Sequence, residues 1–90
     1  MTLEFKPATP DETAEYVRLR GLTRENAISE DRLRAQGITA DTLARDIMSA
    51  TLLGMTCHSN QQLVGYCFAD ASSGEIVVLA VRPAFVGMIL

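Results

Sequence analysis

The stretch Gly74-Glu75-Ile76-Val77-Val78-Leu79-Ala80-Val81-Arg82-Pro83-Ala84-Phe85 decides the fold. Its six consecutive apolar residues are mostly β-branched, which favours a strand, and a proline ends the run. Because the run is apolar on both faces, we expect a strand over residues 75–82 in the middle of a sheet. The run is far shorter than the roughly 20 apolar residues that cross a bilayer, so no membrane span is predicted.

Two more strand-like segments precede this run, and short polar turns join all three. Residues 52–58 place Leu53, Met55 and Cys57 on one face, and a second strand is predicted over 63–69. The turns between the strands are rich in Ser, Asn, Asp and Gly. The second half of the chain therefore predicts three antiparallel strands joined as hairpins.

The first half carries most of the charge and has the pattern of one strand followed by helices. Residues 1–45 hold seven basic and eight acidic side chains, whereas residues 46–90 hold one and three. Residues 2–7 alternate Leu3 and Phe5 with charged residues, which predicts a half-buried strand. A helix is then expected, with Thr9 and Glu12 forming a capping box. Its expected apolar stripe consists of Ala14, Val17, Gly21 and Leu22.

Further cap signals predict one or two more helices before residue 51. Ser29 is a candidate N-cap and Gly37 a candidate helix stop. Thr39 or Asp41 can begin the next helix, whose apolar face contains Leu43, Ala44, Ile47 and Met48. The sequence thus predicts one α+β domain over residues 1–90: a strand, two or three helices, then three antiparallel strands.

Composition narrows the class of protein. The chain has 90 residues, 48% of them hydrophobic, and a net charge of −3. This charge argues against nucleic-acid binding, which needs clustered Lys and Arg. The N-terminus lacks the pattern of a signal peptide, so we expect a cytoplasmic protein with Cys57 and Cys67 reduced. These two cysteines and His58 do not have the spacing of a zinc site, and no metal is expected.

The element order and three stretches resemble the N-terminal half of the GCN5-related N-acetyltransferase (GNAT) family. Leu3 to Glu12 is similar to that family's first strand and helix cap, and Leu63 to Ala69 resembles its third strand. Gly74 to Phe85 resembles its fourth strand, with Leu-x-Val-x-Pro followed by an aromatic residue and Gly87. The resemblance implies a truncated domain whose sheet is incomplete.

The resemblance also implies a site for acetyl-CoA. In that family, backbone N–H groups of a bulged fourth strand hold the acetyl carbonyl, and the matching residues here are Leu79, Ala80 and Val81. The same residues also fit an ordinary central strand. The family's next loop cradles the CoA pyrophosphate. Only Gly87 matches that loop, because Val86 stands where the family has Arg or Gln.

Other site residues follow from the resemblance. Arg24, Glu25 and Asn26 match the region that lines the pocket for the acceptor amine, and Glu75 could act as a base through water. A structural role without function explains the same residues: residues 24–26 also fit a solvated helix end, and Glu75 also fits the polar first residue of a strand.

Five remaining polar or titratable positions carry no catalytic prediction. His58 ends a strand beside a turn, so we expect it to be exposed, and Tyr16 and Tyr66 are expected to pack while their hydroxyls stay in water. Cys57 and Cys67 are interpreted as small core residues, since no base is positioned beside them.

Three functional hypotheses remain. The first is an N-acetyltransferase that moves acetyl from acetyl-CoA to a small amine but is impaired by truncation. The second is a non-catalytic fragment that forms a homodimer through strand 75–82 and the C-terminal tail, because an unpaired strand edge attracts another chain. The third is an unrelated α+β ligand-binding module, which would be favoured if residues 75–82 did not pair with residues 63–69.

Overall fold

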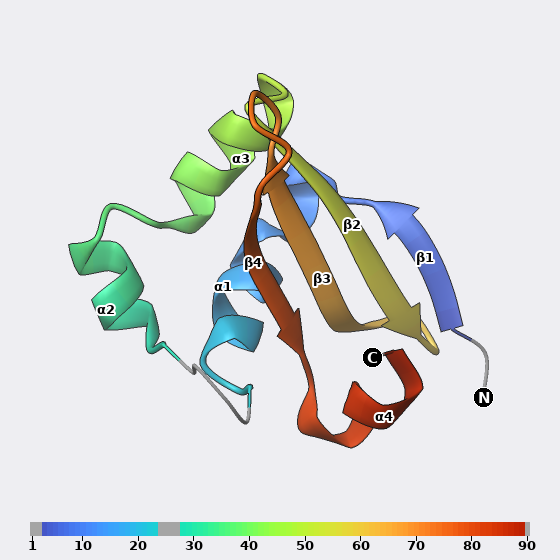
Figure 1. Ribbon diagram of the computed structural model, residues 1–90. Helices are drawn as coiled ribbons and strands as arrows, with labels where there is room; N and C mark the ends of the chain where they lie inside the picture. The colour runs from blue at the N-terminus through green and yellow to red at the C-terminus, as the bar shows by residue number, and fades with distance from the viewer. Residues whose placement is uncertain (1–2, 24–27, 90) are drawn as a thin grey trace.

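The computed structural model describes residues 3–23 and 28–89, and of residues 88 and 89 only the backbone. Within these ranges strands, short 3-10 turns and helices follow one another along the chain (Figure 1). In chain order they are β1 (Leu3–Pro7), η1 (Pro10–Glu12), α1 (Thr13–Arg20), α2 (Glu30–Ala35), α3 (Ala40–Met48), β2 (Leu52–Ser59), β3 (Gln62–Asp70), β4 (Ile76–Val81), η2 (Pro83–Phe85) and α4 (Val86–Ile89). The predicted strands and helices are therefore present, with ends that differ by one or two residues.

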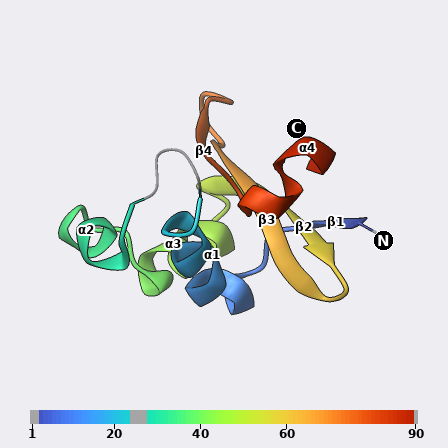
Figure 2. The same ribbon diagram turned by 90° about the horizontal axis from the view of Figure 1, so that it is seen from below.

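The strands form one antiparallel sheet in the order β1-β2-β3-β4. Helices α1, α2 and α3 lie on one side of this sheet, and the short α4 lies on the other (Figure 2). Strand β4 pairs with β3 from Gly65↔Val81 to Ala69↔Ile76. A lack of pairing between these segments would have favoured the hypothesis of an unrelated module, and the pairing removes that support.

Strand β4 is the outermost strand of the described sheet, not a central one as its apolar sequence suggested. Its outer edge has no neighbour within the described residues, and Ile76, Val77 and Leu79 are exposed. The prediction of a central position was wrong. An apolar run on both faces of a strand indicates that both faces can be buried, but it does not indicate whether another strand pairs with each edge.

The core lies between α1 and the helix-facing side of the sheet. Tyr16 and Leu19 of α1 pack against Tyr66 and Phe68 of β3, and the three aromatic rings lie 5.2–5.4 Å apart between centroids. The expected stripe of α1 was largely wrong: of its members Val17 is buried, whereas Ala14, Gly21 and Leu22 are exposed. The short turn η1 shifts the phase of the helix, so that Tyr16 and Leu19 face inward with Val17.

The helix caps predicted from local sequence are confirmed for α2 and α3. Ser29 Oγ accepts a hydrogen bond from the N–H of Arg32, and Thr39 forms a capping box with Thr42. Gly37 adopts a φ of 82°, the left-handed conformation that ends a helix. The capping box predicted at Thr9 and Glu12 was wrong, because the Thr9 side chain makes no capping hydrogen bond.

Glu12 instead contacts His58, which was expected to be exposed but is only 8% exposed. The distance between His58 Nε2 and Glu12 Oε2 is 2.8 Å. The expected exposure of the tyrosine hydroxyls was also wrong for Tyr66, whose buried hydroxyl donates to the carbonyl of Tyr16 at 2.8 Å. Both contacts join segments about fifty residues apart, which a local pattern cannot reveal.

Two features absent from the described residues bear on the class of protein. No helix in ranges 3–23 and 28–89 has the length and apolar character to cross a membrane. Across the same residues, no three or more His, Cys, Asp or Glu side chains are grouped closely enough to hold a metal ion.

Candidate functional site

The backbone of β4 presents hydrogen-bonding groups to the open edge of the sheet. The N–H of Arg82 donates to the carbonyl of Val64 in β3, so the neighbouring pair Gly65↔Val81 is of the non-hydrogen-bonded type. In an antiparallel ladder the two types alternate, so Ala80 bonds to β3 while the N–H groups of Leu79 and Val81 point outward. Two of the three residues predicted to contact an acetyl carbonyl thus aim donors away from the sheet.

Accessibility distinguishes these two donors. Leu79 is about half exposed, whereas Val81 is buried near the end of the strand that is continuous with η2 and α4. The ladder is irregular opposite Phe68 and Ala69, where Val77 has no register partner. A bulge of this kind twists an edge strand and re-aims the groups beside it. Of the predicted residues Leu79 to Val81, Leu79 is therefore the one that has an outward N–H and is exposed.

The segment after β4 lacks the charged side chains that would bind the diphosphate of CoA. Residues 83–89 form η2 and α4 without a charged side chain, and Arg82 directs its Nε to the carbonyl of Leu63 at 3.0 Å. Gly87 is exposed, and a Cβ added there would meet nothing within 4 Å. The outward N–H of Leu79 thus fits a thioester carbonyl, but residues 83–89 do not supply the charge that a diphosphate needs.

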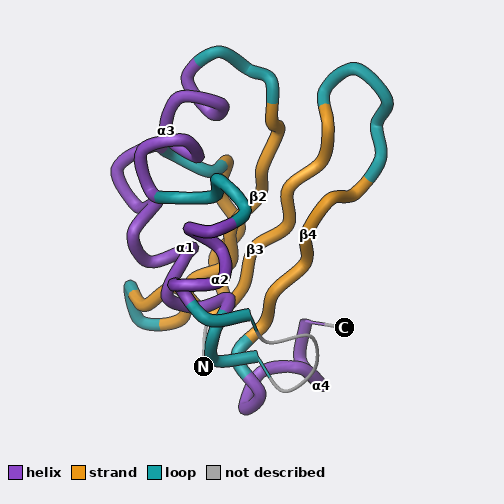
Figure 3. The backbone as a smooth tube through the Cα atoms, turned by 90° about the vertical axis from the view of Figure 1, so that its left-hand side faces the viewer, coloured by secondary structure: helices purple, strands orange, loops and turns teal. Residues whose placement is uncertain are grey.

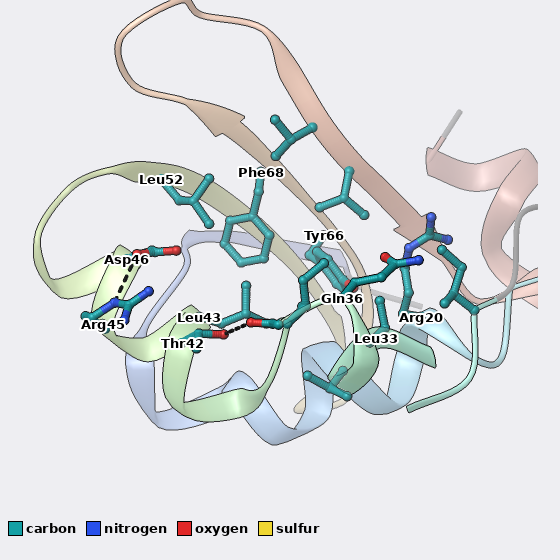
Figure 4. A pocket seen from close by; sticks show the side chains of 16 residues that line it. Arg20, Leu33, Gln36, Thr42, Leu43, Arg45, Asp46, Leu52, Tyr66 and Phe68 are labelled. Atoms are coloured by element: carbon teal, nitrogen blue, oxygen red, sulfur yellow. Dashed lines mark hydrogen bonds and ion pairs between the residues drawn. The ribbon is translucent and has the colours of Figure 1, made fainter. Parts of the chain in front are cut away.

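A cavity of about 350 Å³ lies on the helix side of the sheet, next to the first half of β4 (Figure 4). Val77 and Val78 form its β4 wall, and Tyr66 and Phe68 form its β3 wall. The remaining lining comes from α1, α2, α3 and the segments that flank them: Val17, Arg20, Ile28, Leu33, Gln36, Gly37, Ile38, Thr42, Leu43, Arg45, Asp46 and Leu52. Its walls are mainly apolar and a few polar side chains reach it, which is the usual make-up of a small-molecule site.

The cavity contains functional groups that sequence reasoning missed. Asp46 reaches its wall from α3, and its Oδ1 lies 3.5 Å from Arg45 Nε (Figure 4). Tyr66 closes its floor, and burial raises the pKa of this phenol to about 12. The phenol therefore stays protonated near neutral pH. Alternation along residues 63–69 could have assigned Tyr66 to the helix-facing side, but no local signal places Asp46 in the wall of the same cavity.

The other predicted site residues do not meet at this place. Glu75 is exposed in the turn before β4, where its N–H donates to Ser73 Oγ, and it does not line the cavity. Four residues along a strand separate it from Leu79, or about 13 Å. Arg24, Glu25 and Asn26 lie outside the described residues. Thus Leu79 follows Val78, which lines the cavity, but does not line it itself, and the roles of Glu75 and residues 24–26 stay predictions.

Solved acetyltransferase structures resemble this arrangement. The PaiA N-acetyltransferase of Thermoplasma acidophilum, solved with coenzyme A, has a TM-score of 0.75 at 14% identity over 96% of this chain. An aminoglycoside acetyltransferase from an uncultured soil sample has a TM-score of 0.62 at 20% identity, also over 96%. A GCN5-related N-acetyltransferase of Ralstonia eutropha has a TM-score of 0.66 at 13% identity over 94%.

These similarities establish the fold. The described chain has the N-acetyltransferase fold of the GNAT type, with a mixed α+β arrangement and an open antiparallel sheet. It covers 62%, 62% and 65% of the three solved chains. No family model matches the sequence, and no curated protein matches it either.

Proposed function

We propose that this chain provides the acyl-CoA strand and the acceptor cavity of an N-acetyltransferase that moves acetyl from acetyl-CoA to a small amine. The observation that carries the proposal is the outward N–H of Leu79, a half-exposed residue on an edge strand whose first half forms a cavity wall. A donor and a cavity on adjoining parts of one strand can hold two reactants close together, which is the main requirement of group transfer.

Leu79 would serve the acetyl group. A thioester carbonyl gains negative charge on oxygen when an amine attacks its carbon, and a fixed N–H donor stabilises that charge. The backbone of β4 is held by its ladder with β3, so the donor does not have to be ordered during the reaction. Bound acetyl-CoA supplies the activated acetyl group. Ala80, whose N–H bonds to β3, supports the strand and does not itself donate.

The cavity would serve the acceptor. Its apolar walls suit a hydrocarbon part, and the carboxylate of Asp46 suits a protonated amine. Residues 83–89 lack the charges for a diphosphate, so the proposed contact is with the acetyl end of the cofactor. We also expect weak affinity. The cytoplasmic location expected from the sequence accords with this activity and stays a prediction.

Calorimetric titration tests the proposal with two ligands that differ only at the thioester. Acetyl-CoA is expected to bind more tightly than CoA, because CoA has no carbonyl for the Leu79 N–H. Leu79→Pro removes this outward N–H and leaves the β3–β4 ladder intact. One hydrogen bond is worth about 1 kcal/mol, so the preference for acetyl-CoA should fall about fivefold.

Ile76→Pro is the matched control. The N–H of Asp70 donates to the carbonyl of Glu75, so the pair Ala69↔Ile76 is non-hydrogen-bonded and Ile76 also points its N–H outward. This variant should keep the preference for acetyl-CoA. An absence of heat with millimolar acetyl-CoA, or an equal loss in both variants, would contradict the proposal.

A second candidate function is a non-catalytic module that associates with another copy through residues 75–90. It is favoured by the free edge of β4, by the exposure of Ile76, Val77 and Leu79, and by the lack of charge along residues 76–81. Exposed apolar edges without charged residues attract other chains. A monomeric mass in sedimentation at micromolar concentration would count against it.

A further inference from the structure

The side of the sheet that faces away from α1, α2 and α3 carries an exposed apolar surface. Residues opposite one another in an antiparallel sheet share a face, so one row runs Pro7–Met55–Cys67–Leu79 and another runs Leu53–Ala69–Ile76. We call this surface the uncovered face and define it by its largest side chains and its central cysteine: Phe5, Leu53, Met55, Cys67, Ile76 and Leu79. Apart from Cys67, each of them is 48–63% exposed.

The placement of the helices explains this exposure. Figures 2 and 3 show α1, α2 and α3 together on the opposite side of the sheet, with only the short α4 on this side. At the end of the face next to η2, Cys57 and Val81 are buried. The large apolar side chains on the remainder of the face are about half exposed. The sequence prediction that Leu53, Met55 and Cys57 share a face is confirmed. Two of the three, Leu53 and Met55, are nevertheless exposed.

We propose that a second copy of this chain packs against the uncovered face, so that two sheets stack face to face around a twofold axis. The inference rests on the self-association of the oligomeric candidate in the preceding section but places the contact on another surface, of which only Ile76 and Leu79 lie within residues 75–90. It does not depend on acetyl-CoA binding. A twofold interface brings the same patch of each copy together, which requires a self-complementary surface.

The lack of charged side chains on this face allows two copies of it to pack together without repulsion. Each copy carries a net charge of −3, which disfavours most contacts between copies. The two rows and Phe5 contain no charged side chain, whereas Glu4 and Lys6 of β1 point to the opposite side of the sheet. Most acidic residues belong to the helical half, behind the sheet. Stacking through the uncovered face therefore keeps the like charges of the two copies apart.

The size of the face fits a weak to standard dimer. Five large side chains, each about half exposed, present on the order of 400 Å² of apolar surface. A standard interface buries about 800 Å² per partner, slightly more than half of it apolar. The face thus supplies the apolar centre of such an interface, and its surroundings supply the rim.

Pairing through the edge of β4 is the less favourable geometry. The bulge at Val77 interrupts the edge, and Val81 is buried at its other end. Only Leu79 and Ile76 then offer outward, exposed backbone groups, which is few for a strand pair. Face-to-face stacking uses the side chains of the same two residues and does not need a regular edge.

The test is sedimentation of the 90-residue chain between about 1 and 100 μM, the range that the estimated interface implies. The wild type should pass from monomer to dimer. Met55→Lys places a charge within the face and should shift the dimerisation constant at least tenfold toward monomer. Met48→Lys is the matched control, because Met48 is 76% exposed on α3, and it should dimerise like the wild type. Circular dichroism checks that both variants are folded.

A crosslinking measurement decides the matter if Met55→Lys does not fold. Cys57 is buried, so a bismaleimide of about 10 Å, the separation of packed sheets, should join two copies through Cys67. Cys67→Ser should remove the crosslink. A wild-type monomer at 100 μM overturns both this surface and the oligomeric function. A dimer that survives Met55→Lys, or one that does not crosslink through Cys67, overturns the surface alone.

Discussion

His58 Nε2 lies 2.8 Å from Glu12 Oε2, and this contact fastens η1 to the end of β2. The imidazole is nearly buried, whereas the carboxylate is about one-third exposed. Glu12 also lies 3.4 Å from the hydroxyl of Tyr16, whose ring is part of the core. One acidic side chain therefore couples the start of the helical layer to the sheet.

Glu12→Ala should destabilise the fold by removing the partner of a buried histidine. Because His58 Nδ1 already has no hydrogen-bond partner among the described residues, the variant leaves both ring nitrogens without one there. We expect the free energy of unfolding to fall by about 1–3 kcal/mol in urea denaturation. Glu15→Ala is the control: Glu15 pairs with Arg18 on the exposed surface of α1, so its loss should cost no more than about 0.5 kcal/mol. Equal effects would show that the buried contact adds nothing.

Gly54→Ala should destabilise the sheet by overpacking. Gly54 pairs with Phe68 across β2 and β3, and a Cβ at this position would overlap the Phe68 ring and lie 2.7 Å from the Cβ of Ala8. A loss of about 1–3 kcal/mol is expected in thermal or urea unfolding. Gly87→Ala, where a Cβ meets open space, should leave the stability within about 0.5 kcal/mol of the wild type. An unchanged stability of Gly54→Ala would contradict this close packing.

Alkaline pH should unfold the protein partly through Tyr66. Burial raises the pKa of Tyr66 from 10.0 to about 12, so the unfolded chain loses this proton at lower pH than the folded chain. Its contribution is complete below pH 10 and is lost as the pH rises through 12. It amounts to about 2 kcal/mol.

Tyr66→Phe tests this pH dependence. At neutral pH the variant should lose about 1 kcal/mol, because the Tyr16 carbonyl no longer accepts the Tyr66 hydroxyl. Between pH 10 and 12 its stability should fall less steeply than that of the wild type. Tyr16 retains a pKa that burial raises, so a shallower slope remains. Parallel pH profiles of the two proteins would contradict the assignment.

Thr9 and Thr39 were both predicted as helix caps, and replacing each by alanine should change the free energy of unfolding by different amounts. Thr39→Ala removes the capping box of α3 and should cost about 1 kcal/mol of unfolding free energy. Thr9→Ala should change the stability by less than about 0.5 kcal/mol, because Thr9 uses its backbone to contact the Tyr16 hydroxyl and its side chain caps nothing. A larger loss for Thr9→Ala than for Thr39→Ala would reverse the interpretation of both helix ends.

The difference between Thr9 and Thr39 shows which structural roles the local sequence could predict. Ser29, Gly37 and Thr39 act on backbone groups within four residues, and their predicted roles are confirmed. The box at Thr9 failed because Glu12 has a partner 46 residues away. The candidate site divides in the same way. The position of Leu79 on a strand followed from the sequence, but the cavity on the helix side of that strand has walls from several elements, with Asp46 from α3 and Tyr66 from β3.

The sequence by itself determined the elements and the antiparallel pairing of β2, β3 and β4, because alternation, caps and short turns act between neighbours along the chain. That information was sufficient for an α+β domain with three consecutive antiparallel strands. Tertiary structure alone decided which side of the sheet the helices cover. It also made β4 an edge strand and left Phe5, Met55 and Leu79 exposed. These outcomes depend on contacts between distant segments, and an apolar residue has the same sequence signature whether or not a partner covers it.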